Sequence, residues 1–293
     1  MLDQTITHID DFKTQFDIAE VFEVYSRHKN YEIINLNQND DRCFIYFSSN
    51  AIYYPNTKEV FEDRIIKNNR FDWKKNIVSS ARKVILIRDV FKTWYLKGVN
   101  AELNSVEKVL DFLKQETKGL RVTCLGSSAG GYAAVLFGCL LQAERVFSFS
   151  GQFSLFHGLS NEIIRREQPF LVESEEISKI NKYYSLKKFI SESKVPIFYF
   201  YPEGCDLDFP QAQEISDLPI VYPFAFRGIA HGQTCYPINF LDIFNKSSME
   251  LISLCQIFKD ETIHPFIFST RVSGWKKTIL YTAEKILKRI TLG

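Results

Sequence analysis

The sequence has no excess of either charge and no long apolar run. Lysine and arginine total 36 against 35 aspartate and glutamate residues, so the formal net charge is +1. A balanced chain offers no global field to a polyanion, and we therefore expect no nucleic-acid partner. The longest apolar stretch, residues 133–141 with its flanks, is far shorter than the roughly 20 residues that a membrane-spanning helix needs.

The first twelve residues are acidic and polar, without the basic and apolar regions of a secretory signal. We expect no such signal and a soluble, cytoplasmic protein. Internal repeats, low-complexity segments and Pro/Gly/Ser-rich linkers are also missing from the sequence. The simplest division is one domain over 1–293, with 1–40 as an N-terminal decoration and 261–293 as a basic amphipathic tail.

Cysteine and histidine are few and scattered. None of the six cysteines forms a C-x-x-C pair, and no His/Cys group has zinc-ligand spacing. We therefore expect buried free thiols, no disulfide and no metal site. Nucleotide-binding motifs and redox pairs are absent as well, so we expect no cofactor. The cysteines are Cys43, Cys124, Cys139, Cys205, Cys235 and Cys255.

Short apolar runs alternate with helical patterns along the chain. Runs of this kind are typical of strands buried on both faces, and their alternation with helices predicts an α/β fold with three layers and a mostly parallel central sheet. Helical patterns cover 57–69, 104–118, 129–141, 177–191 and 238–258. The predicted strands cover 31–36, 43–47, 83–87, 121–125, 145–149, 195–201 and 220–226.

One motif dominates the middle of the sequence. Residues 121–132 read RVTCLGSSAGGY, which puts Gly126, Ser128 and Gly130 in the places of G-x-S-x-G between a strand and a helix. A side chain that must project from the top of a sheet sits on a sharp turn, and the flanking residues then approach closely enough to require glycine. The helix that follows directs its free N–H groups at whatever Ser128 attacks.

With this motif the sequence resembles the α/β-hydrolase superfamily. The resemblance implies an α/β-hydrolase-type fold and a serine nucleophile whose partners follow in the order acid, then histidine. Of five histidines, only His231 follows the last predicted strand in a short loop, as His-Gly. The alternative for His231 is a loop residue that caps the next helix. His157 falls in an irregular segment, where it is expected to line a pocket without catalysing.

The acid is expected in the loop after the strand 195–201, and two aspartates compete there. Asp206 lies four residues before Pro210, a distance that resembles the family's acid loops, and we favour it. Asp208 is the alternative, although it is also placed to cap the next helix. The loop one strand earlier reads Ser-Gly-Gln over 150–152 and offers no carboxylate.

The resemblance also implies an oxyanion hole and a substrate wall. The backbone N–H of Ala129 is one expected donor, and Ser49, after the strand 43–47, is chosen as the second. An ordinary polar turn is the alternative for Ser49. Trp94 and Tyr95 follow the strand 83–87 at the carboxyl edge of the sheet, where ligands bind in open α/β sheets. They either wall a substrate site or pack beneath their loop.

These residues predict a serine enzyme that acts on acyl esters, small or carbohydrate-borne, through an acyl-enzyme. A carboxyl-ester hydrolase is our first hypothesis. The G-S-S-x-G-G elbow also resembles bacterial enzymes that acetylate or deacetylate surface polysaccharides, so an O-acetyltransferase with a separate acyl donor is the alternative. A non-catalytic, hydrolase-like binding scaffold is the third hypothesis.

The C-terminal tail has its own pattern. Ile279, Leu280, Ala283, Ile286, Leu287 and Ile290 fall on one face of a predicted helix, with lysines and arginine off that face. Such a helix either packs on the domain or on a second copy in a homodimer, or lies on an anionic membrane surface with Trp275 as its anchor.

Overall fold

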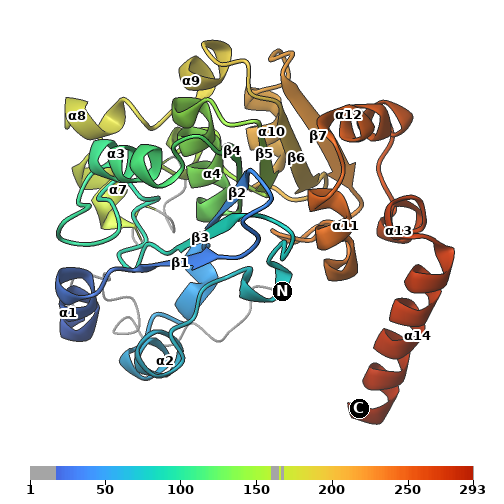
Figure 1. Cartoon of the computed structure of the whole chain (residues 1–293), viewed down its shortest axis with the longest axis horizontal. Coiled ribbons are helices and arrows are strands. Elements are labelled where there is room, and N and C mark those ends of the chain that lie inside the picture. The colour runs from blue at the N-terminus through green and yellow to red at the C-terminus, as the bar shows by residue number, and fades with distance from the viewer. Residues whose placement is uncertain (1–17, 160–164, 166–167, 293) are drawn as a thin grey trace.

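The computed structural model describes residues 18–159, 165 and 168–292. Their centre is a seven-stranded sheet in the order β1-β3-β2-β4-β5-β6-β7 (Figure 1). Strands β2 to β7 are parallel, and β1 pairs with β3 in the antiparallel direction. The predicted α/β fold with a mostly parallel sheet is therefore confirmed. The strands are β1 Tyr31–Asn35, β2 Arg42–Phe47, β3 Lys83–Ile87, β4 Arg121–Ser127, β5 Arg145–Phe149, β6 Ile197–Pro202 and β7 Val221–Phe226.

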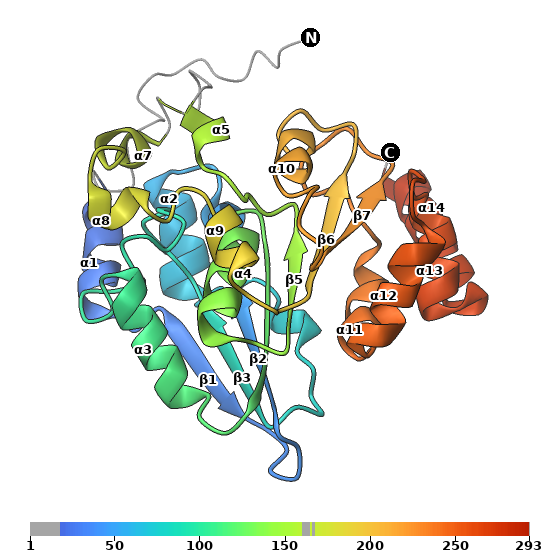
Figure 2. The same cartoon turned by 90° about the horizontal axis from the view of Figure 1, so that it is seen from above.

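Helices cover both faces of this sheet and make three layers (Figures 1 and 2). One core contains side chains of α3, α4 and α9, and the other contains side chains of α11, α12 and α13. The helices are α1 Ala19–Arg27, α2 Lys58–Phe61, α3 Val106–Glu116, α4 Ala129–Leu141, α5 Phe156–Leu159, α7 Pro169–Glu173, α8 Ser178–Asn181, α9 Lys187–Ser191, α10 Phe209–Glu214, α11 Phe240–Phe244, α12 Ser248–Ile257, α13 Pro265–Ser273 and α14 Trp275–Leu292.

Alternation along each strand divides its side chains between the two cores. In β5, Val146 packs with the α4 side, whereas Phe147 and Phe149 pack with the α11 side. The phenylalanine rings on that second face stack from strand to strand, with 4.7 Å between the centroids of Phe149 and Phe200. Strands β2 to β6 are mostly buried, which accounts for their continuous apolar runs, whereas the edge strands β1 and β7 are only partly buried.

Two long predicted helices are broken in the structure. The segment 238–258 contains a short 3-10 turn and α11, and then α12 begins anew. Ser247 and Glu250 form a capping box that satisfies the first N–H groups of α12, which explains the second start. The segment 177–191 is likewise divided into α8 and α9. Apolar periodicity runs through both breaks, so it did not reveal them.

The segment 1–40, predicted as an N-terminal decoration, contains a strand of the central sheet. Strand β1 pairs along its whole length with β3. All six cysteines are free, and five are buried while Cys255 is half-buried, as expected for thiols within a core. Among the described residues, no helix combines the length and the apolarity needed to cross a membrane.

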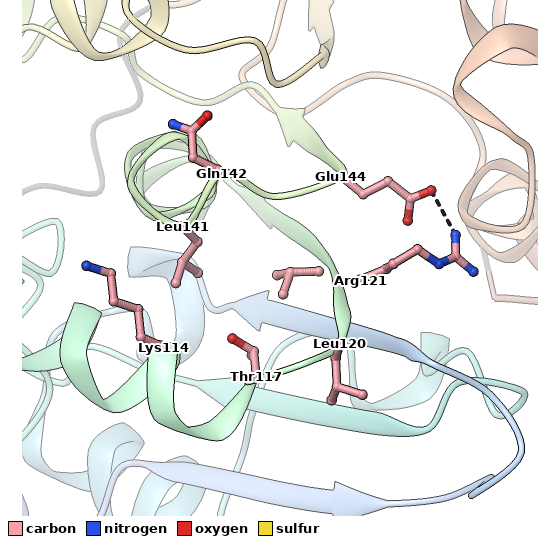
Figure 3. Close-up of a pocket in the computed structure, with 8 residues that line it drawn as sticks. Lys114, Thr117, Leu120, Arg121, Leu141, Gln142 and Glu144 are labelled. Carbon is pink, nitrogen blue, oxygen red and sulfur yellow. Dashed lines mark hydrogen bonds and ion pairs between the residues drawn. The ribbon is translucent and has the colours of Figure 1, made fainter.

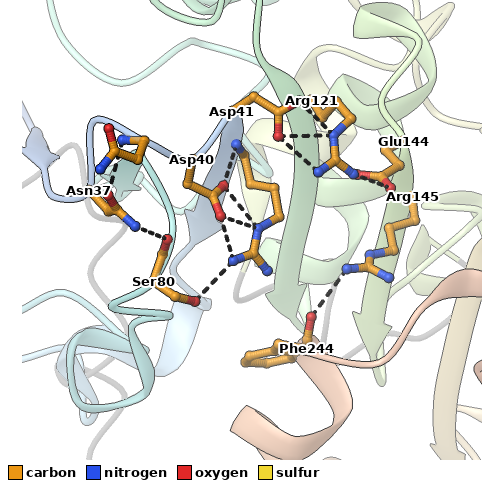
Figure 4. A network of polar contacts seen from close by, with 10 residues as sticks. Asn37, Asp40, Asp41, Ser80, Arg121, Glu144, Arg145 and Phe244 are labelled. Carbon is orange, nitrogen blue, oxygen red and sulfur yellow. Dashed lines mark hydrogen bonds and ion pairs between the residues drawn. The ribbon is translucent and has the colours of Figure 1, made fainter.

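The amino ends of the strands carry ion pairs instead of reactive groups. Arg42 pairs with Asp40, and Arg121 pairs with both Asp41 and Glu144 (Figure 4). Exposed pairs of this kind contribute about 0–1 kcal/mol each. A cavity of about 380 Å³ at this end is lined by Arg121, Glu144 and residues of α3 and α4 (Figure 3). Because β4 begins at Arg121, this cavity lies at the opposite end of the strand from Ser128.

Close backbone approach fixes the turn between β4 and α4. A Cβ atom added to Gly126 would lie 2.1 Å from the carbonyl oxygen of Gly130, and one added to Gly130 would lie 2.2 Å from that of Phe47. Both distances are far inside van der Waals contact with backbone atoms, which cannot swing aside as a side chain can. The glycines of the motif are therefore required by packing at the end of the sheet.

We expect Gly126→Ala to lower the free energy of unfolding by about 3 kcal/mol or more, because the backbone must move to admit the methyl group. Gly119→Ala is the control, since Gly119 has a positive φ of 76° but nothing within 4 Å of its added Cβ. Gly119→Ala should lower the free energy of unfolding only by the strain of an alanine in a left-handed conformation, about 1–2 kcal/mol. Urea unfolding of both variants measures the difference, and equal losses would contradict the packing explanation.

Candidate active site

Three side chains from three loops meet at the carboxyl ends of the strands. Ser128 follows β4, Asp208 follows β6 and His231 follows β7. The Oγ of Ser128 lies 2.9 Å from Nε2 of His231, and Nδ1 of His231 lies 3.0 Å from each carboxylate oxygen of Asp208. A carboxylate only accepts, so the proton between His231 and Asp208 belongs to Nδ1, and Nε2 is left to accept from the Ser128 hydroxyl.

Ser128 occupies a strained position at the start of α4. Its φ is 53° and its ψ is −123°, an arrangement that costs a non-glycine residue about 1–3 kcal/mol. Two backbone hydrogen bonds hold it there: its N–H donates to the carbonyl of Phe149, and its own carbonyl accepts from the N–H of Tyr132. Helix α4 behind it is almost completely buried, which keeps this turn rigid.

Asp208, and not the favoured Asp206, contacts the imidazole. Asp208 precedes α10 as its N-cap residue, but its side chain makes no cap hydrogen bond and turns to His231. Its side chain is only 1% exposed. Asp206 lies exposed two residues earlier and lines the cavity in front of Ser128. The turn before α10 decides which carboxylate points inward. The spacing between the aspartates and Pro210 does not reveal that turn, so the expectation that Asp206 contacts the imidazole was wrong.

The loop that carries His231 is held by a serine that sequence reasoning missed. The N–H of Gly232 donates to the Ser150 hydroxyl at 3.1 Å, and Gly232 itself has a φ of 82°. Ser150 also has a positive φ, 49°, at the end of β5. In the sequence, residues 150–152 differ from an acid loop only by lacking a carboxylate, and a hydroxyl that accepts from a distant backbone N–H leaves no signal there.

Cys205 lies beside the same pair. Burial raises the pKa of its thiol, and the nearby Asp208 carboxylate raises it further. Among the described residues, the one group of histidine, cysteine and acidic side chains with potential metal ligands within 4.8 Å of one another is Cys205, Asp208 and His231. A cation there would have to displace the hydrogen bond between Asp208 and His231. The expected absence of a metal site stays a prediction.

A cavity of about 460 Å³ opens in front of Ser128 and His231. Trp94 contributes one wall, and its indole N–H donates to the side-chain oxygen of Gln152 at 3.1 Å. Gln211 anchors the opposite side through its amide oxygen, which accepts from the N–H groups of Phe153 and Ser154. The lining residues are Trp94, Ser128, Gln152, Ser154, Leu155, His157, Gly158, Leu171, Asp206, Leu207, Pro210, Gln211 and His231.

Comparison with solved structures bears on the fold. The capsule O-acetyltransferase of Neisseria meningitidis serogroup A, in complex with caged gadolinium, aligns with a TM-score of 0.51 at 14% identity, over 78% of this chain and 92% of that one. A variant of the same enzyme in complex with CoA aligns with a TM-score of 0.50 at 13% identity, over 76% and 98%. No protein-family model matches the sequence, and no curated protein sequence matches it.

The strand–turn–helix around Ser128, followed in chain order by an aspartate and a histidine beyond later parallel strands, decides the architecture. The chain has the α/β-hydrolase fold. In this fold the nucleophile stands at the carboxyl edge of the sheet, and the loops after neighbouring strands shape the ligand site. In this chain the loops after β3 and β5 line the cavity in front of Ser128 through Trp94 and Gln152.

The loop after β3 is built around one buried carboxylate. Asp89 is 3% exposed and accepts hydrogen bonds from the N–H groups of Phe91, Thr93 and Tyr95 at 3.0, 2.6 and 2.9 Å. Burial raises its pKa to about 6, although these hydrogen bonds act in the opposite direction. Lys92, Trp94 and Tyr95 all have a positive φ between 53° and 63°. The carboxylate therefore stabilises a strained loop.

Trp94 and Tyr95, predicted together, have different surroundings in this fold. Trp94 lines the cavity, whereas Tyr95 is fully buried and its hydroxyl donates to the carbonyl of Ser48 at 2.8 Å. Tyr95 thus packs beneath the loop, which was the alternative for both residues. A left-handed backbone at both positions turns one ring outward and the next inward, and aromatic content alone does not predict this difference.

The two residues expected in the oxyanion hole differ in whether their backbone N–H already has a partner. Ala129 is the first residue of α4 and is buried directly behind Ser128, so its N–H belongs to the free amino end of the helix. Ser49 donates both its N–H and its hydroxyl to the carboxylate of Asp72, at 3.0 and 2.8 Å. Its N–H would become available only if that carboxylate moved away.

Proposed function

We propose that the chain is a serine enzyme that cleaves carboxyl esters through an acyl-enzyme, with Ser128, His231 and Asp208 as its catalytic triad. The proposal rests on one observation, the continuous set of hydrogen bonds from the Ser128 hydroxyl through His231 to Asp208. A serine hydroxyl is a weak nucleophile, and a base within hydrogen-bond reach that is itself oriented by a carboxylate makes it reactive.

In the proposed reaction, Oγ of Ser128 attacks the ester carbonyl while Nε2 of His231 takes its proton. The carbonyl π electrons move to the oxygen, and the tetrahedral oxyanion is stabilised by the N–H of Ala129. The oxyanion then collapses, the ester C–O bond breaks, and His231 gives its proton to the leaving alkoxide. The buried Asp208 holds the imidazole in the required tautomer and stabilises its charged form.

Water is the simplest second reactant. His231 takes a proton from the water as the water oxygen attacks the acyl carbon, the bond between that carbon and Oγ of Ser128 then breaks, and His231 returns the proton to Oγ as the acid leaves. Ser49 remains a proposal as the second oxyanion donor, and it requires Asp72 to release its N–H. Trp94 is proposed to contact the substrate, since it lines the cavity beside Ser128.

A second candidate function is transfer of the acyl group to a carbohydrate hydroxyl. The fold of this chain is similar to that of a capsule O-acetyltransferase, which is the observation that favours it. The cavity also combines the indole of Trp94 with amide groups of Gln152 and Gln211, a mixture of apolar and hydrogen-bonding groups suited to a sugar face. A transferase uses the same three residues, with the acceptor hydroxyl in place of water.

We expect the purified chain to release p-nitrophenolate from p-nitrophenyl acetate and to be labelled at Ser128 by a fluorophosphonate. Adding oligosaccharide acceptors separates the two candidates: a transferase produces acetylated sugar, detected by mass spectrometry, and a hydrolase produces only acetate. A native chain that shows neither turnover nor labelling would favour the third hypothesis, a non-catalytic scaffold.

A further inference from the structure

The C-terminal helix α14 presents an apolar stripe to the outside of the molecule. It extends from α13 at the outer edge of the structure (Figure 1). Trp275 is 62% exposed and Leu280 is 71% exposed, values far above those of core residues. With 100° between successive residues, these two and their neighbours fall on one side of the helix. The stripe consists of Trp275, Ile279, Leu280, Ala283, Ile286 and Leu287.

The helix packs on the domain through its other, more polar side. Thr278 is fully buried, and its hydroxyl lies 2.8 Å from that of Ser269 in α13. The ring of Tyr281 lies 5.2 Å from that of Tyr236, and Lys277 pairs with Asp242. The sequence pattern predicts burial of the stripe if α14 packs on the domain. The structure instead buries the side that carries threonine and tyrosine, so the stripe is not needed for this packing.

The helix is also positively charged. Residues 275–288 contain four lysines and one glutamate. Lys276 lies next to the stripe with its ammonium 5.5 Å from the Trp275 ring, an arrangement in which the stem lies along apolar surface and the charge reaches outward. Lys285 lies over Tyr281, at 5.7 Å, and so belongs to the side of α14 that packs toward the domain. A ligand that contacts the exposed side of α14 therefore meets an apolar strip with the ammonium group of Lys276 beside it.

We propose that α14 binds the surface of an anionic lipid membrane, with its stripe in the headgroup–acyl boundary and Lys276 against lipid phosphates and carboxylates. Exposed Trp, Ile and Leu on one side of an 18-residue helix, with lysines around them, is the pattern of helices that lie in this interface. Each lysine near an anionic leaflet adds about 1 kcal/mol of attraction.

A second copy of the chain is a less suitable occupant. A two-fold dimer through this stripe places the same patch against itself, so two helices that each carry more lysine than glutamate come together. Like charges at such a contact oppose association. An anionic lipid surface instead neutralises the same charges while it buries the same side chains. The proposal is independent of the reaction at Ser128.

The test is flotation of the full chain with vesicles of phosphatidylcholine containing about 30% phosphatidylserine. We expect binding to these vesicles and about tenfold weaker binding to pure phosphatidylcholine. Ile279→Ser combined with Leu280→Ser should weaken binding about tenfold or more, because both side chains are exposed and their loss leaves the fold intact. Met249→Ser with Ile257→Ser in α12 is the matched control, since these residues are also exposed, and should bind like the parent chain.

Fluorophosphonate labelling of Ser128 should be the same in all these chains, which separates this test from that of the proposed reaction. Absence of flotation with the anionic vesicles would overturn the proposal. Equal flotation of the α14 variant and the α12 control would overturn it as well. Light scattering that finds a dimer lost in the α14 variant, without lipid binding, would identify a second copy as the occupant instead.

Discussion

Replacing Ser128 by alanine is expected to lower kcat for p-nitrophenyl acetate by about 10⁴- to 10⁶-fold. The substitution removes the only atom that bonds to the substrate in the proposed reaction, while the cavity and the N–H of Ala129 remain. KM should change little, because the lost interaction forms in the transition state. Steady-state kinetics on the purified variant, with active-site titration of the parent chain, measures this.

Ser127→Ala is the matched control for that experiment. Ser127 is the last residue of β4 and immediately precedes the nucleophile, but no hydrogen bond joins it to the triad among the described contacts. We expect its activity to remain within a few-fold of the parent. A Ser128→Ala chain that retains more than about one tenth of the parent kcat would show that another group carries the reaction.

Replacing Asp208 by asparagine is expected to lower kcat by about 10⁴-fold, because an amide no longer fixes the imidazole tautomer with its proton on Nδ1. Asp206→Asn serves as the control two residues away. It removes a carboxylate charge that lines the cavity, yet it leaves the contact between Asp208 and His231 intact, so we expect less than about tenfold loss.

Urea unfolding of both aspartate variants checks that folding is unchanged, since Asp208 is buried. The assignment of Asp208 fails if the two substitutions reduce kcat equally, or if Asp206→Asn has the larger effect. The second result would restore Asp206 as the preferred acid, as the loop spacing suggests.

The sheet and the turn that carries Ser128 were predictable because their signals are local. Solid apolar runs mark β3 and β5 to the residue, and the glycines around Ser128 record a turn that only small residues allow. The loop of His231 was found because only this histidine lies in the short loop directly after the last strand. In each case a local physical requirement restricts the residue types, so the sequence shows it directly.

The remaining features depend on orientation within turns and on tertiary contacts. The sequence alone does not distinguish Asp206 from Asp208 as the partner of the imidazole. Only the turn into α10 directs one of the two carboxylates toward His231. The side chains of Trp94 and Tyr95 have different surroundings, and the backbone at both residues is left-handed. No glycine in the sequence indicates this conformation. Ser49 follows β2, but its N–H donates to Asp72, a partner 23 residues later in the chain that its own position does not reveal.

The loop around Asp89 has a consequence for recognition. With four hydrogen bonds converging on one buried carboxylate, the backbone from 91 to 95 has few alternative conformations of comparable energy. A molecule that contacts Trp94 therefore meets a ring already fixed in place and does not have to order it. Association at this wall then loses little conformational entropy, and discrimination between substrates rests on the shape of the rigid surface.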